Sequence, residues 1–226
     1  MKKLVLLIVV SLFYVSNLTA QENNPYDYVG KEHNKILDFT YKKLTKEKKY
    51  QNFKNKANIN FLKNCVIEYY KLNKKEKSSQ ISDIRGYLDK YPFPISSTGP
   101  YYPKSMKKKY RLSNKFDEML SRIFNSVDTA NTKSLIQLVE TIKKDKQLNV
   151  TEKKFLYATI SIGYNSLNYW KKNVVKWKNI GKGGGNNKFS LPSWAKSDIR
   201  GAVIGGLGTG TLAGAIVVGA IWSLTD

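Results

Sequence analysis

His33 is the only histidine of this 226-residue chain, and acidic residues on either side of it raise the question of acid–base or metal chemistry. Asp27, Glu32 and Asp38 are the nearest carboxylates in the sequence. A metal site requires three or four ligands that converge on one point, and a lone histidine among lysines does not supply them. We therefore predict no metal site. We expect residues 24–27 to cap a first helix, with His33 packed near its start.

Cys65 is the only cysteine and the only thiol available as a nucleophile. A thiol needs a neighbouring base, such as His33, to be activated. Cys65 lies between Leu62 and Val66 on an apolar helical stripe, which favours a buried and inert thiol. A single cysteine excludes an internal disulfide, so the domain must rely on its hydrophobic core. We predict no catalytic residues, no cofactor and no enzymatic activity.

A predicted helix at residues 151–170 combines small, polar and aromatic residues, and it allows two interpretations. Ala158, Ile162 and Ser166 follow one another at a spacing of four, and the small ones among them let a neighbouring helix approach closely. The pattern is typical of tight helix packing, or of a polar groove that binds a ligand between aromatic walls. Packing is the more frequent outcome for such a stripe. The groove residues would be Ser161, Ser166, Tyr169 and Trp170.

The elements that position these residues are predicted to be helices. Apolar residues recur at three- and four-residue spacing in six segments, and no alternating strand pattern competes with them. Ser113 is the expected N-cap of the fourth segment, and Pro92 ends the third. The sequence therefore predicts an all-α fold with a basic domain of about six helices. The segments are residues 31–44, 57–72, 81–91, 113–127, 132–144 and 151–170.

An aromatic, proline-rich stretch at residues 91–102 interrupts the helical pattern and predicts an irregular loop. Its rings suit sugar binding, a membrane interface or packing across the helices. Rings beside lysines also stack on nucleic-acid bases, but export argues against that use.

The two ends of the chain differ in composition from the helical middle. Residues 1–20 have the basic start, the apolar segment and the small final residue, Ala20, of a secretory signal peptide. Residues 21–178 form the predicted helical domain. Residues 179–195, rich in glycine and asparagine, form a flexible linker that lacks the ending of a phosphate loop. Residues 196–226 form a glycine-rich apolar segment that we predict to associate with a membrane.

The C-terminal segment has no charge from Gly201 to Thr225. A helix rises about 1.5 Å per residue and a bilayer core is about 30 Å thick, so its length predicts a transmembrane helix. Its small residues recur at a spacing of four in two adjacent columns, like the GxxxG motifs that bring membrane helices together. We therefore predict a glycine-zipper helix that packs closely in a homo-oligomer or a hairpin. The residues of this membrane and oligomer face are Gly201, Ala202, Gly205, Gly206, Gly210, Gly214 and Trp222.

The formal net charge of the chain is +22, which predicts attraction to polyanions. A signal peptide would direct the protein to the cell envelope, where anionic lipid and polysaccharide are the polyanions it would meet. These are therefore the expected partners, and a specific nucleic acid is not. The alternative is that the charge serves only solubility. Lys196 and Arg200 precede the apolar segment and nothing basic follows it, which opposes ordinary stop-transfer anchoring.

Three pieces of the sequence together resemble a group of uncharacterised exported proteins from Bacteroidetes-type bacteria. They are NPYDYVGKEHNKILD, which begins at Asn24, VTEKKFLYATISIGYNSLNYW, which ends at Trp170, and the glycine-rich apolar C-terminus. The shared patterns are N-P-Y-D-x-V-G-x-x-H-N and S-I-x-x-x-S-x-x-Y-W. The resemblance implies export, and it supplies neither an activity nor catalytic residues.

Three functions follow as hypotheses. The first is an exported, membrane-associated, non-enzymatic protein of the cell envelope, tethered by its glycine-zipper helix. The second is a secreted membrane-active protein, similar to bacteriocins or pore-forming proteins. The third is an unrecognised envelope enzyme, which ranks last because the usual sets of acid, base and nucleophile are missing from the sequence.

Overall fold

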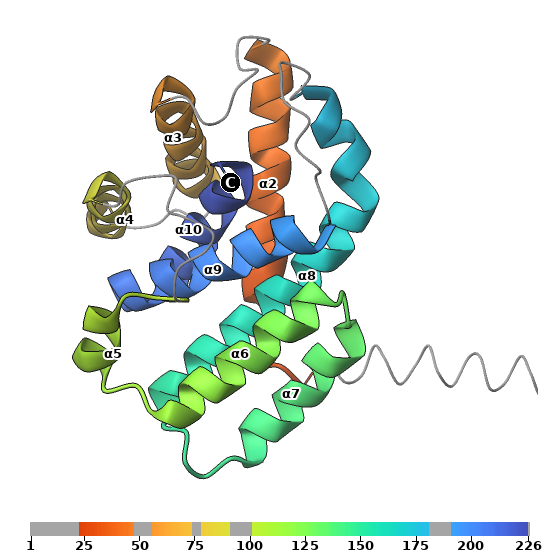
Figure 1. Ribbon diagram of the computed structural model, residues 1–226. Helices are drawn as coiled ribbons and strands as arrows, with labels where there is room; N and C mark the ends of the chain where they lie inside the picture. Colours follow the sequence, from red (N-terminus) through yellow and green to blue (C-terminus); the bar gives the residue numbers. More distant parts are fainter. Residues whose placement is uncertain (1–22, 48–55, 74–77, 91–100, 181–190, 226) are drawn as a thin grey trace, which may run out of the picture.

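The computed structural model describes residues 23–47, 56–73, 78–90, 101–180 and 191–225, and these are helical without a strand. This confirms the all-α prediction. The described helices, shown in Figure 1, are α2 (Asp27–Glu47), α3 (Lys56–Asn73), α4 (Ser78–Lys90), α5 (Lys104–Tyr110), α6 (Asn114–Asp128), α7 (Thr132–Lys144), α8 (Val150–Ile180), α9 (Leu191–Thr209) and α10 (Leu212–Thr225).

The six predicted segments correspond to α2, α3, α4, α6, α7 and α8. The predicted cap of α6 is confirmed, because the Ser113 hydroxyl accepts a hydrogen bond from the amide of Phe116 at 3.1 Å. Asn131 caps α7 in the same way, through the amide of Ser134 at 3.0 Å. The short helix α5 was not predicted. It ends at Arg111, whose φ of 50° is left-handed and closes the helix.

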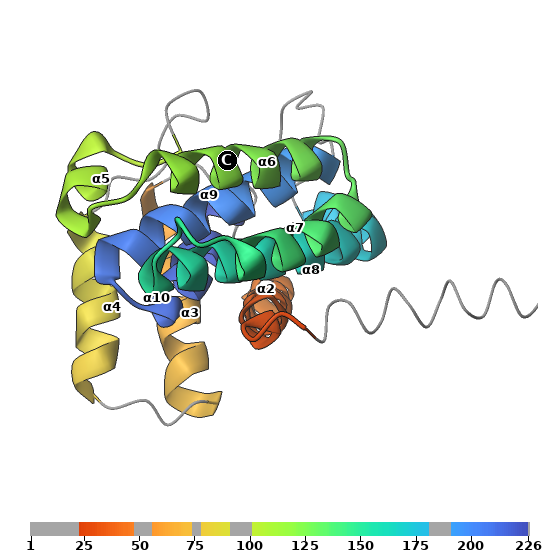
Figure 2. The same ribbon diagram turned by 90° about the horizontal axis from the view of Figure 1, so that it is seen from below.

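The long helix α8 organises the fold. It contacts α2, α6, α7, α9 and α10, so most of the other described helices pack against α8. Figures 1 and 2 show α6 and α7 together along α8, and α2 crossing it elsewhere. Helices α9 and α10 lie in the middle of this arrangement, and α10 also contacts α2, α3 and α4.

The C-terminal apolar segment consists of two helices that form a hairpin, and the prediction of a transmembrane helix is wrong. Among the described residues, no helix combines the length and the apolar character that crossing a membrane requires. The physical reason lies at Gly210, whose φ of 72° is left-handed and reverses the chain. The 14 residues of α10 therefore reach about 21 Å, against about 30 Å of bilayer core.

Several predicted features fall wholly or partly outside the described residues. The expected signal peptide, residues 1–20, is one of them. Of the predicted loop at 91–102, only its last two residues are described, and both are tyrosines that pack on the helices. Residues 181–190 of the predicted linker also lie outside the described part, while α8 and α9 contain the linker residues on either side.

Candidate functional site

The hairpin of α9 and α10 has the most extensive contact between any two described helices. Some of the predicted small residues, Gly201, Gly205 and Gly214, lie in this contact. A Cβ atom on Gly205 would lie 2.2 Å from the carbonyl oxygen of Gly214, and one on Gly201 would lie 2.7 Å from that of Val218. Real Cβ atoms do not approach backbone so closely, so the two helices meet at a distance that only glycine permits.

The turn between the two helices is stabilised by threonine hydroxyls. Thr209 Oγ1 donates to the carbonyl of Gly205 at 2.8 Å and accepts from the amide of Thr211 at 3.1 Å. Thr211 Oγ1 in turn accepts from the amide of Gly214 at 3.0 Å, which makes Thr211 the N-cap of α10. Residues 208–213, which we call the hairpin tip, are exposed or half-buried and uncharged.

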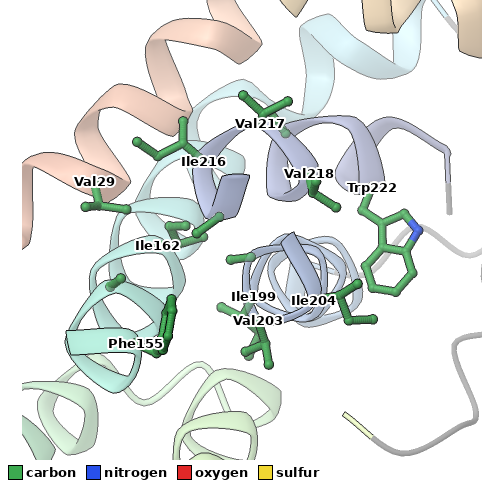
Figure 3. Packing of buried hydrophobic residues seen from close by; sticks show 14 of the residues in the cluster. Val29, Phe155, Ile162, Ile199, Val203, Ile204, Ile216, Val217, Val218 and Trp222 are labelled. Carbon is green, nitrogen blue, oxygen red and sulfur yellow. The ribbon is translucent and has the colours of Figure 1, made fainter. Parts of the chain in front are cut away.

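From Gly201 to the end of α10, the outer surface of the hairpin is as uncharged as its inner seam. Figure 3 shows Val29 of α2 and Ile162 of α8 on one side of it, with Ile216 and Val217 of α10 pointing away from α9. Val217 has no exposed surface. A helix that is apolar all round belongs either in the core of a protein or in a membrane. In this structure the hairpin lies among helices α2 to α8, which we call the shell.

A buried polar cluster of His33, Trp170 and Asp198 connects the hairpin to the shell. Asp198 lies on α9, and its Oδ2 accepts a hydrogen bond from Trp170 Nε1 of α8 at 2.8 Å. Its Oδ1 lies 3.4 Å from His33 Nε2 of α2. The side chains of His33 and Asp198 are fully buried. The helix α10 approaches the same point, because a Cβ on Gly219 would lie 3.3 Å from the His33 ring.

The electrostatics of this cluster favour a charged His33. Burial is the largest single influence and lowers the pKa of the imidazole, but the charge and hydrogen bonding of Asp198, together with hydrogen bonds to Asn34 and the backbone of Gly219, outweigh it, so the pKa of His33 is raised above 6.5. A buried ion pair is costly to break, because removing one partner leaves the other charged and unsolvated. Neither His33 nor Asp198 has exposed surface with which to meet a substrate in this conformation. The cluster therefore holds helices together.

The residues of the predicted groove on α8 lie at its contacts with other helices, where all four are buried. Ser161 Oγ accepts from the amide of Gly30 at 2.9 Å and donates to the carbonyl of Asp27 at 2.8 Å. Tyr169 donates to Asp38 at 3.0 Å, and burial raises its pKa. The arrangement matches the packing interpretation of the pattern. The four residues are Ser161, Ser166, Tyr169 and Trp170.

Apart from Gly210, the remaining residues of the predicted membrane and oligomer face also lie within the molecule. Ala202 and Trp222 are buried, and Gly206 faces Ala215 and the ring of Phe155. Gly210 forms the turn and does not belong to a seam. The sequence thus identified residues that pack closely, and their close partner in this structure is the other half of the same hairpin.

Sequence reasoning missed the acidic residues that the fold buries. Neither Asp198 nor Glu152 was among the candidate residues predicted from the sequence. Glu152 bridges two segments, because its carboxylate accepts from the amides of Ser113 at 2.6 Å and Asn149 at 2.8 Å. An acid next to an uncharged run is the signal that could have identified Asp198, since it must be paired if the run is buried.

The other candidates for chemistry do not form a reactive site among the described residues. Burial raises the pKa of the Cys65 thiol to about 12, and Cys65 lies in the core as predicted. No group of three or more histidine, cysteine or carboxylate side chains is placed to hold a metal ion in the part of the chain that the structure describes.

No protein-family model, curated protein or solved structure matches this chain. The resemblance to exported Bacteroidetes-type proteins stays a prediction. The two internal motifs that carry it do contact one another. Asn34 Nδ2 donates to the carbonyl of Asn165 at 3.0 Å, and Asn24 Nδ2 donates to that of Tyr157, also at 3.0 Å. Both motifs thus serve the packing of α2 on α8.

Proposed function

We propose that this protein is an exported, non-enzymatic protein that acts on anionic membranes by transferring its apolar hairpin from the shell to the lipid. The observation that carries the proposal is the glycine seam between α9 and α10. Because the inner faces of the two helices pack against each other in the seam, the hairpin can leave the shell as a unit once Asp198 separates from His33 and Trp170. From Gly201 onward its outer faces are uncharged and largely apolar, so they suit lipid as well as they suit the protein core.

The dimensions of the hairpin favour entry from one side of the bilayer without crossing. Helix α10 reaches about 21 Å, which is less than the thickness of the hydrocarbon core. A hairpin that enters tip first leaves both of its ends on the side of entry. Lys196 and Arg200, near the start of α9, then stay among the headgroups, where their charge is favourable next to anionic lipid. This removes the topological difficulty that a stop-transfer anchor would face.

The charge of the chain supports a negatively charged target. At +22 the protein is drawn electrostatically to anionic lipid, and polysaccharide anions in the envelope would concentrate it in the same way. The alternative of a tethered envelope protein loses support, because the segment that would form the tether is the core of the fold.

The first test is dye release from vesicles of phosphatidylglycerol and phosphatidylcholine. We expect the protein to bind and to release dye from the anionic vesicles, and to release little from phosphatidylcholine alone. Sedimentation with the vesicles establishes binding independently of leakage. Binding to anionic vesicles without any release of dye, at micromolar protein, would show that the protein only adsorbs.

The second test follows the outer face of the hairpin with a thiol. In a Cys65→Ser background, Val217→Cys places a thiol on α10 where it has no exposed surface. We expect a lipid-soluble maleimide to label it only when anionic vesicles are present. The control is Leu138→Cys on α7, which is also buried but packs within the shell. Equal labelling of both thiols on vesicles would indicate general unfolding and contradict hairpin transfer.

A further inference from the structure

We propose that the hairpin tip and helix α5 together form the surface that first contacts the membrane, with α5 binding anionic lipid headgroups. This inference rests on the proposed function and specifies which part of the protein meets the bilayer. It depends on two features that lie at the same end of the molecule. One is uncharged and enters the lipid, and the other is basic and stays at its surface.

The tip is the exposed end of an otherwise buried hairpin. Gly210 and Thr211 are exposed, and Leu212 is half-buried against the core. No charged residue occurs in residues 208–213. Insertion of this end requires no charge to be moved into lipid, and the apolar lengths of α9 and α10 follow directly behind it. The opposite end of the hairpin has Lys196 and is the less favourable end to insert.

Helix α5 is adjacent to this tip. The hydroxyl of Tyr110 lies 3.4 Å from where a Cβ of Gly210 would be, and α5 contacts α9. Figures 1 and 2 both show α5 at the end of the molecule where α9 turns into α10. Tyr110 packs edge-on against Phe155 at 6.3 Å between ring centroids, which holds α5 in place beside the hairpin.

The charges of α5 suit a lipid headgroup layer. Lys104, Lys108 and Lys109 are exposed, whereas Lys107 forms an ion pair with Asp117. The amine of Lys109 lies 5.0 Å from the centre of the Tyr110 ring. Three exposed cations with a tyrosine are typical of a protein surface at the membrane interface, where cations bind phosphates and tyrosine sits at the headgroup level. The occupant that fits a basic helix next to an uncharged insertion point is an anionic bilayer.

The tip is tested by adding a charge without removing its cap. Aspartate and asparagine both replace the capping oxygen of Thr211, so Thr211→Asp and Thr211→Asn should fold equally well. We expect Thr211→Asp to bind anionic vesicles but to lose at least tenfold in the rate of dye release, because a carboxylate at the tip opposes entry into lipid. Thr211→Asn should stay within about threefold of the natural protein, since asparagine adds no charge.

Helix α5 is tested by two triple variants with the same change in charge. We expect Lys104→Gln, Lys108→Gln and Lys109→Gln together to weaken binding to phosphatidylglycerol vesicles on the order of 100-fold, because each lysine near such a surface contributes several-fold. The control replaces three exposed lysines of α7, Lys133, Lys143 and Lys144, by glutamine. The control should weaken binding only a few-fold, since charge distant from the surface is screened.

The outcomes separate this inference from the proposed function. If the natural protein releases no dye, the proposed function fails and the tip has nothing to insert. If the natural protein releases dye but the two triple variants bind alike and Thr211→Asp releases dye like Thr211→Asn, hairpin transfer stands and this contact surface is wrong. Matching thermal transitions for all variants in solution would show that differences in vesicle binding and dye release do not come from differences in folding.

Discussion

At the scale of single residues, the side chains that could do chemistry are buried in contacts between helices. His33 pairs with Asp198 in the core, and Cys65 is a buried thiol whose pKa burial raises to about 12. Glu32 accepts a hydrogen bond from Tyr69 on α3, so it also serves the contact of α2 with its neighbour. A charged group such as Glu32 or Asp198 costs free energy when it is buried unpaired, and its partner offsets that cost.

The first prediction concerns the pH dependence of stability, which His33 should control near neutral pH. Its pKa is raised in the folded state, so its contribution to the free energy of unfolding is fully present below pH 6.5. That contribution is lost as the pH rises through the raised pKa. We expect urea unfolding between pH 6 and pH 9 to show stability falling as the pH rises.

His33→Asn provides the comparison for this slope. The variant should be less stable than the natural protein at pH 6, by about 3 kcal/mol or more, because it leaves the Asp198 carboxylate buried without a charged partner. It should also lack the decline in stability above neutral pH. An identical decline in the variant would mean that another group titrates, and that the pair of His33 and Asp198 is not charged.

At the scale of elements, the hairpin depends on glycine for its geometry. Two helices usually keep 8–10 Å between their axes because side chains separate them, and small residues allow a closer approach. Gly201, Gly205 and Gly214 provide this in the α9–α10 seam, where their neighbours include backbone carbonyls that cannot move aside cheaply. Glycine lowers the stability of a helix in water, so the packing of α9 against α10 must offset that loss of free energy.

The second prediction compares the same substitution in two helices. Gly205→Ala should destabilise the fold by about 1–3 kcal/mol, because the added methyl meets the backbone of Gly214. Gly86→Ala in α4 should stabilise it by about 0.5–1 kcal/mol, because nothing lies within 4 Å of the added atom and alanine favours the helix. Denaturant midpoints measure both. Stabilisation by both substitutions would show that the hairpin is loosely packed.

At the scale of the whole molecule, the apolar C-terminus and the helices of the shell depend on one another. The shell helices have apolar faces that need a core, and α9 and α10 fill much of it. The hairpin needs the shell in water, because its outer surface is apolar. The hydrocarbon core of a membrane is a second apolar environment for the hairpin, and this is the physical basis of the proposed transfer.

The third prediction is that the shell does not fold without the hairpin. Removal of residues 201–226 should abolish the cooperative thermal transition and the near-ultraviolet circular dichroism, because the apolar faces of α2, α3 and α8 would lose their partner. A cooperative transition in the truncated chain would instead support an independent helical domain at residues 21–178, as the composition of the sequence predicts.

The sequence predicted the helices well because helical periodicity is a local property. Phe116, Leu120, Ile123 and Val127 form one stripe in the sequence, and all four are buried in α6. Ser113 was correctly identified as a cap for the same reason, since a cap acts within its own turn. Helix α5 was missed because its seven residues are mostly lysine and present no apolar stripe.

The C-terminus shows the limit of the same reasoning. Its length and lack of charge predicted one helix across a membrane, but a single left-handed glycine at position 210 divides it into two short ones. The sequence has many glycines there and does not reveal which of them adopts a positive φ. The packing of α9 on α10 decides that, through contacts such as Gly205 with the carbonyl of Gly214, and these exist only once the hairpin has formed.

The sequence by itself determined that this protein is helical and has a formal net charge of +22, because periodicity and net charge need no knowledge of distant contacts. Only the tertiary structure decided what the small-residue columns pack against, and that His33 and Asp198 meet. Those outcomes depend on residues such as Gly205 and Gly214, or His33 and Asp198, that are separated in the chain and meet only when the hairpin closes within the shell.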